Sequence, residues 1–213
     1  MQTREAHSKP GLVIKPVRPV AAIRNLLEQY GALTLGERCT QYQHGAQCAA
    51  LAQAAGASEA LIGAAFLHDI GHLIALDRRL LGTNRLGHRD HAVIGASQLR
   101  RWGFPPEVVE PIALHVEAKR YLASTATDYR AKLSAASADT LQQQGMQMSD
   151  AQQYAFITNP FSEDALALRH WDDAGKQADI DCRNLAHWLQ VCERLLPPSS
   201  NQTYEEQHER TFA

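Results

Sequence analysis

The sequence is poor in cysteine and contains no Cys-x-x-Cys pair. Its four thiols, Cys39, Cys48, Cys182 and Cys192, show no small secreted disulfide framework, so we expect them to be reduced. No apolar run approaches the ~18 residues that a membrane-spanning helix requires. The charged and polar start of the chain predicts no signal peptide. Together these absences predict a cytoplasmic protein.

The chain also lacks an excess of charge of either sign. Its formal net charge is −2 over 213 residues, which gives no general attraction to nucleic acid or to an anionic membrane. We therefore expect neither of them as a partner. An anionic substrate would have to be recognised by a few local groups, and the oligomeric state stays open.

Strand-like patterns are missing as well. No segment alternates apolar and polar residues with enrichment in β-branched side chains, whereas apolar residues recur at helical spacing. The predicted fold class is therefore all-α, in one domain, with a flexible arm over 1–17 and a polar tail over 197–213. Gly71 is expected to end regular structure before a loop over 73–88. Helices are predicted over 19–30, 40–55, 58–70, 90–102, 105–117, 128–143, 149–157, 162–174 and 184–195.

What the chain does have is a chelating step, His68-Asp69, directly after an apolar run. One such dipeptide is weak evidence, because ten His and eleven Asp residues in this length supply about half a copy by chance. It gains weight from further imidazoles and carboxylates on predicted helices. The candidate partners are His44, His91, His115 and Asp172.

Two of these partners have competitors nearby. His88 and His91 both flank Asp90, and His91 is preferred because it begins a helix with apolar periodicity. Asp172 and Asp173 are adjacent, and spacing alone does not choose between them. Cysteine is absent from the candidate set, which argues against a structural zinc knuckle.

The order His44, His68-Asp69, Asp172 resembles the H…HD…D pattern of the HD-domain superfamily, whose members are all-α metalloproteins and mostly phosphohydrolases. Four later stretches are similar to a narrower group, the PhnZ-like mixed-valent diiron oxygenases of phosphonate catabolism: 115–122, 133–137, Thr140-Leu141 with Gln144-Gly145, and 168–177. This resemblance favours Asp172 over Asp173. It implies a single HD-domain helical bundle over 18–196.

The resemblance implies two iron ions, Fe(II) and Fe(III), with O2 as co-substrate. One iron would be held by four residues, His44, His68, Asp69 and Asp172. The other would be held by His91 and His115, with Asp69 bridging the two. The implied reaction cleaves the C–P bond of a small 1-hydroxyalkylphosphonate and gives inorganic phosphate and a carboxylate. The implied substrates are 2-amino-1-hydroxyethylphosphonate, its trimethylammonium analogue and hydroxymethylphosphonate.

Donors for a phosphonate are also predicted. Lys119 lies four residues after His115, and His72 four after His68, so continuing helices would aim both at the metals. With Asp69, they are the predicted catalytic residues.

By resemblance, Ser137 and Arg169 contact the phosphonate, and Glu37 lies near a substrate amino group. Thr34 departs from the family, which has a tyrosine there, and this leaves the substrate tail open.

A second function shares all six ligands. An HD-domain phosphohydrolase would use the same metals to activate water against a nucleotide or another phosphate ester. The ligand set alone therefore predicts a metal-dependent enzyme with a small anionic substrate, and the later segments favour the oxygenase.

Overall fold

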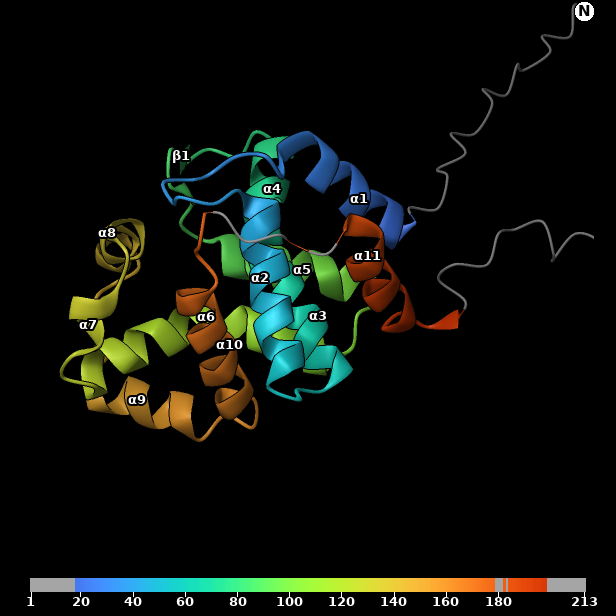
Figure 1. The fold of residues 1–213 in the computed structure, drawn as a ribbon. Coiled ribbons are helices and arrows are strands. Elements are labelled where there is room, and N and C mark those ends of the chain that lie inside the picture. The colour runs from blue at the N-terminus through green and yellow to red at the C-terminus, as the bar shows by residue number, and fades with distance from the viewer. Residues whose placement is uncertain (1–17, 179–181, 183, 199–213) are drawn as a thin grey trace, which may run out of the picture.

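The structure, a computed structural model, describes residues 18–178, 182 and 184–198 (Figure 1). The predicted arm over 1–17 and most of the predicted tail lie outside this part of the chain. The described residues form a helical bundle with one short hairpin, so the all-α fold class is confirmed. The helices are α1 (Pro19–Tyr30), α2 (Gln41–Ala54), α3 (Glu59–Leu67), α4 (Ile70–Asp77), α5 (His91–Arg101), α6 (Pro106–Thr125), α7 (Tyr129–Lys132), α8 (Ala135–Gln143), α9 (Asp150–Ile157), α10 (Ser162–Ala174) and α11 (Leu185–Arg194).

The centre of the bundle is α3, whose residues from Leu61 to Leu67 are all buried. A helix that is apolar on every side is stable only when other helices surround it. Here α2, α6, α10 and α11 pack against it (Figure 1). Ser58 begins α3 by accepting a hydrogen bond from the backbone N–H of Leu61. The core thus fixes the end of α3, where His68 and Asp69 follow.

The sequence prediction was wrong about where α3 stops. Helix α3 ends at Leu67, and α4 begins at Ile70, so the break falls on His68-Asp69 rather than at Gly71. Gly71 lies inside α4, where a Cβ atom would come within 1.9 Å of the carbonyl oxygen of His91. Its missing side chain lets α4 and α5 approach closely. His68 and His72 therefore do not lie on one face of a single helix, contrary to the prediction.

Other boundaries differ too. The predicted loop over 73–88 contains the end of α4 and an antiparallel hairpin, β1 (Thr83–Asn84) with β2 (Gly87–His88). Helix α6 continues to Thr125, well beyond the predicted end. The predicted helix over 128–143 is divided into α7 and α8, because Ser134 caps α8 through the backbone N–H of Ser137.

No single helix in the described ranges is long and apolar enough to cross a membrane. Helices α3 and α4 meet that test only as a pair, bent by 43° at the break between them. Most residues of both helices are buried inside the bundle.

Candidate metal centre and substrate pocket

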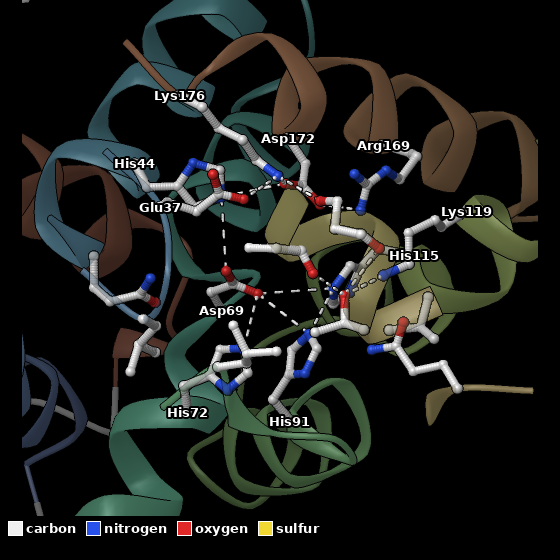
Figure 2. Close-up of a pocket in the computed structure, with 18 residues that line it drawn as sticks. Glu37, His44, Asp69, His72, His91, His115, Lys119, Arg169, Asp172 and Lys176 are labelled. Atoms are coloured by element: carbon white, nitrogen blue, oxygen red, sulfur yellow. Dashed lines mark hydrogen bonds and ion pairs between the residues drawn. The ribbon is translucent and has the colours of Figure 1, made fainter. Parts of the chain in front are cut away.

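The six side chains predicted as metal ligands converge from five parts of the chain, and Figure 2 labels five of them, His44, Asp69, His91, His115 and Asp172. Five of them are buried, and the sixth, Asp69, has a side chain that is 21% exposed. A cavity of about 60 Å³ is lined by all of them except His68. The six are His44 on α2, His68 and Asp69 in the break between α3 and α4, His91 on α5, His115 on α6 and Asp172 on α10.

One cluster gathers around His44. Its Nε2 atom lies 3.2 Å from His68 Nε2, 3.2 Å from Asp172 Oδ1 and 3.6 Å from Asp69 Oδ2. Two imidazole nitrogens and two carboxylate oxygens thus face one point. This donor set suits a divalent transition metal.

A second cluster uses the other oxygen of Asp69. Asp69 Oδ1 lies 3.3 Å from His91 Nε2 and 3.8 Å from His115 Nε2, and these two nitrogens are 3.0 Å apart. Since Oδ2 faces the first cluster, the Asp69 carboxylate spans both. Imidazoles surround it, and although burial raises the pKa of Asp69, His68 and its neighbours hold that pKa well below its usual range.

The nitrogen spacings fit shared metal ions. Two ligands about 2.1 Å from one ion and at right angles to each other lie about 3.0 Å apart, whereas tetrahedral ligands lie about 3.4 Å apart. The two Nε2 pairs, at 3.2 and 3.0 Å, are closer to the right-angle value. Without a cation or a shared proton, two lone pairs this close would repel. The residues therefore fit a dinuclear centre with high-coordinate ions.

The imidazoles of both clusters are held with Nε2 facing inward. A backbone carbonyl can only accept, so each Nδ1 beside one carries a proton and leaves the Nε2 lone pair for a metal. In the first cluster, His44 Nδ1 lies 2.9 Å from the carbonyl oxygen of Gly175, and His68 Nδ1 lies 2.9 Å from that of Ala65. In the second cluster, His91 Nδ1 lies 3.0 Å from the carbonyl oxygen of His88, and His115 Nδ1 lies 2.7 Å from that of Ile112. Burial also lowers the pKa of His91 and His115, which favours neutral rings.

His72 is held the opposite way round. The backbone N–H of His88 donates to its Nδ1 at 2.9 Å, so a neutral ring carries its proton on Nε2. Its ring stacks on His91 with centroids 3.9 Å apart, and Nε2 lies 3.8 Å from Asp69 Oδ1. Burial lowers the pKa of His72 and favours that neutral form. His72 therefore offers the cavity a hydrogen-bond donor instead of a metal ligand.

The competing residues lie outside both clusters. His88 Nε2 contacts the carbonyl of Leu81 at 3.0 Å. Cys48 is closer, with Sγ 3.7 Å from His44 Nδ1, but that nitrogen already faces the Gly175 carbonyl. Burial raises the pKa of the Cys48 thiol, which donates to the carbonyl of Trp171. We therefore count Cys48 as a support for His44 and not as a ligand.

A family model for the HD domain matches residues 42–157, more than half of this chain. The chain belongs to the HD-domain family. The matched segment contains every ligand described above except Asp172, which α10 supplies from outside it.

Relatives within the family are known by name. The chain is 36% identical over 184 residues to the hydroxymethylphosphonate dioxygenase of Gimesia maris, covering 86% of this chain and 91% of that protein. It is 34% identical over 162 residues to the [1-hydroxy-2-(trimethylamino)ethyl]phosphonate dioxygenase (glycine-betaine-forming) of Leisingera caerulea, covering 76% and 82%. An uncharacterised protein of Acanthamoeba polyphaga mimivirus is 35% identical over 186 residues, covering 87% and 85%. The predicted relation to the PhnZ-like HD-domain oxygenases is thereby confirmed.

Of the described cationic residues that line the pocket of this HD domain, Lys119 is the one without an ion-pair partner. It is 3% exposed, lines the cavity, and its Nζ donates to Thr140 Oγ1 at 3.0 Å. Among the described residues, no carboxylate forms an ion pair with it. Burial, and then the charge of Arg169, lower the pKa of Lys119 to about 7. A buried ammonium group without a counter-ion is a ready site for an anion.

Arg169 also lines the pocket, but its charge is already matched. Its guanidinium group contacts Asp172 Oδ2 at 2.5 Å and also pairs with Asp173. Tyr129 accepts from Arg169 Nε at 2.9 Å and donates to Asp173 at 2.6 Å. Asp173, the alternative to Asp172 in the sequence, therefore pairs with Arg169 and helps to fix the position of its guanidinium group.

Glu37 and Ser137 line the same cavity, as predicted site residues, and Lys176 joins them. Lys176 Nζ lies 2.7 Å from Ser137 Oγ. It also lies 3.1 Å from Glu37 Oε1 and 3.5 Å from Asp172 Oδ1 (Figure 2). The sequence analysis did not single out Lys176 as a site residue. It follows Asp172 by four residues, but α10 ends at Ala174, so helical spacing does not place it.

Seven more lining residues were not predicted as site residues, namely Leu35, Gln41, Leu86, Val116, Ala136, Thr140 and Gln144. Thr140 and Gln144 follow Ser137 by three and seven residues, which is one face of a helix and was a usable signal. Leu35 gave no such signal. It lines the cavity with φ +44°, whereas Thr34, at the family's tyrosine position, is exposed and does not line it.

Proposed function

We propose that this protein is an iron-dependent oxygenase that cleaves the C–P bond of a small 1-hydroxyalkylphosphonate. The balanced reaction is R–CH(OH)–PO3²⁻ + O2 → R–COO⁻ + HPO4²⁻ + H⁺, in which C1 is oxidised and O2 is reduced. The observation that carries the proposal is the relation, over three quarters or more of the chain, to two dioxygenases whose names specify phosphonates.

The donor sets support iron. His91, His115 and Asp69 form a group of two imidazoles and one carboxylate, which is typical of non-haem Fe(II) oxygenases that keep open coordination positions. His44, His68 and Asp172 would hold the second ion, with Asp69 bridging. When bound, the pair of irons would supply the redox chemistry with O2 that side chains lack.

The remaining groups would bind and orient the phosphonate. Lys119 offers a charge-assisted donor, while Ser137 and Arg169 lie on the same cavity wall. His72 Nε2–H would donate to an oxygen of the substrate beside Asp69. Because these donors are buried, their bonds to a charged substrate would be stronger than in water.

The test is to load the protein with iron and to follow O2 uptake and phosphate release with a panel of 1-hydroxyphosphonates. We expect phosphate to appear only when O2 is present. Release of phosphate from a phosphate ester at the same rate without O2 would instead support the phosphohydrolase, because hydrolysis needs water alone.

A further inference from the structure

The Glu37 end of the pocket is already electrically neutral. Glu37 Oε1 accepts from Ser134 Oγ at 2.7 Å and pairs with Lys176 Nζ at 3.1 Å. The two side chains are only 14% and 13% exposed, so little water screens the pair. A cationic substrate group that entered here would need the Glu37 carboxylate as its partner. It would be repelled by the ammonium group of Lys176, which already pairs with that carboxylate.

Aromatic side chains are missing from the same surface. Within the described part of the chain, the residues that line the cavity include no Phe, Tyr or Trp. Proteins recognise quaternary ammonium groups through the faces of such rings. The apolar contacts available here come from Leu35, Leu86, Val116 and Ala136.

The cavity is also small. Its 60 Å³ corresponds to roughly four to six water-sized groups at 10–15 Å³ each. Hydroxymethylphosphonate has six non-hydrogen atoms, its 2-amino-1-hydroxyethyl counterpart eight, and the trimethylammonium analogue eleven. Of the three, the first is the closest match to this volume.

From these three observations we infer that the pocket selects a 1-hydroxyphosphonate with a small, uncharged tail, of the hydroxymethylphosphonate type. Lys176 is the specificity-determining residue, because it forms the ion pair with Glu37 that a cationic substrate tail would otherwise form. The inference rests on the proposed function, and it makes that function specific to one substrate class.

The experiment compares three phosphonates on iron-loaded protein: hydroxymethylphosphonate, 1-hydroxyethylphosphonate, which is larger and uncharged, and 2-amino-1-hydroxyethylphosphonate. Binding is measured by calorimetry without O2, and kcat/KM from phosphate release with O2. We expect the affinity and kcat/KM for the amino compound to be at least tenfold below those for hydroxymethylphosphonate, and also below those for the uncharged larger compound. Equal or tighter binding of the amino compound overturns the inference, even if all three are turned over.

Lys176→Met tests the residue itself, with Lys176→Arg as the matched control that keeps the charge. Removing the charge should shift the preference ratio toward the amino compound by tenfold or more, whereas Lys176→Arg should keep the wild-type ratio. An unchanged preference ratio in Lys176→Met would show that Lys176 does not determine the substrate preference. If that variant does not fold, the wild-type binding order alone decides. If no phosphonate is turned over but the binding order holds, the proposed function fails and the selectivity stands.

Discussion

At the scale of single residues, the direction in which each imidazole is held separates ligands from donors. Four histidines face backbone carbonyls through Nδ1 and present Nε2 to the metal positions. His72 accepts from a backbone N–H at Nδ1 and presents a proton instead. The sequence analysis placed His72 at the substrate rather than at a metal, but the reason becomes visible only in the tertiary contact with β2.

This difference predicts opposite outcomes for two similar substitutions. His72→Gln should keep two metal ions per chain, because no ligand is lost, and should lower turnover by about 10²–10³-fold through the lost donor. His91→Gln should reduce the metal content toward one ion per chain. Metal analysis of both purified variants, beside steady-state phosphate release, checks this. Loss of metal from His72→Gln would show that His72 is a ligand.

The pKa of Lys119, lowered to about 7 by burial, predicts a pH dependence. An anion favours the charged ammonium form, so binding takes up a proton once the pH exceeds that pKa. The affinity for a dianionic phosphonate should therefore fall as the pH rises from about 8 to 9.5, by up to tenfold per unit. Anaerobic titration at fixed metal content measures it. Lys119→Arg stays charged throughout and should show a flatter profile; parallel profiles would refute this role for Lys119.

At the scale of elements, the metal centre depends on a helix break that local patterns describe poorly. The apolar run predicted a helix, and Gly71 looked like its end. In the folded chain, α3 stops at Leu67, α4 starts at Ile70, and α4 packs on α5. The need for glycine at position 71 comes from its contact with the backbone of His91, twenty residues later in the chain. The residues that meet at the two clusters could be predicted, since their types follow the order of a known family. The position of Lys176 could not, because it follows the end of α10.

Gly71→Ala should therefore disturb the second metal cluster. Its Cβ atom would lie 1.9 Å from the carbonyl oxygen of His91, so α5 must move and the protein should lose more than the about 1–3 kcal/mol typical of overpacking. Gly56→Ala is the control. Its position has a positive φ and open space, so it should cost about 1–2 kcal/mol without changing the metal content. Denaturant melts and metal analysis measure both effects. Full metal content in Gly71→Ala would contradict the close packing.

At the scale of the whole molecule, the two metals would join parts of the chain that are far apart in sequence. The ligands run from His44 to Asp172 and come from α2, the break after α3, α5, α6 and α10. Because these segments pack around one core, binding of two ions would be coupled to folding of the bundle. The resemblance covers this whole region, which is why the fold class could be predicted even where boundaries were wrong.

Removing the metals should therefore lower the stability of the entire bundle. One ion at 100 times its dissociation constant contributes about 2.7 kcal/mol, so two independent ions contribute about 5.4 kcal/mol. Each kcal/mol shifts the melting temperature of a chain this size by about 2–4 °C, so we expect chelation of both ions to lower the melting temperature by about 11–22 °C in calorimetry. Asp69→Ala, which lacks the shared ligand, should show little response to the chelator. An unchanged wild-type melting temperature after complete metal removal would contradict the coupling.

The proposed oxidative C–P cleavage at the dinuclear HD-domain site is tested most directly by the ratio of phosphate formed to O2 consumed. The iron-loaded protein is given hydroxymethylphosphonate in a sealed cell. We expect a ratio of about one, with formate as the other product and no phosphate in the absence of O2. Phosphate released anaerobically, or without consumption of O2, would contradict it.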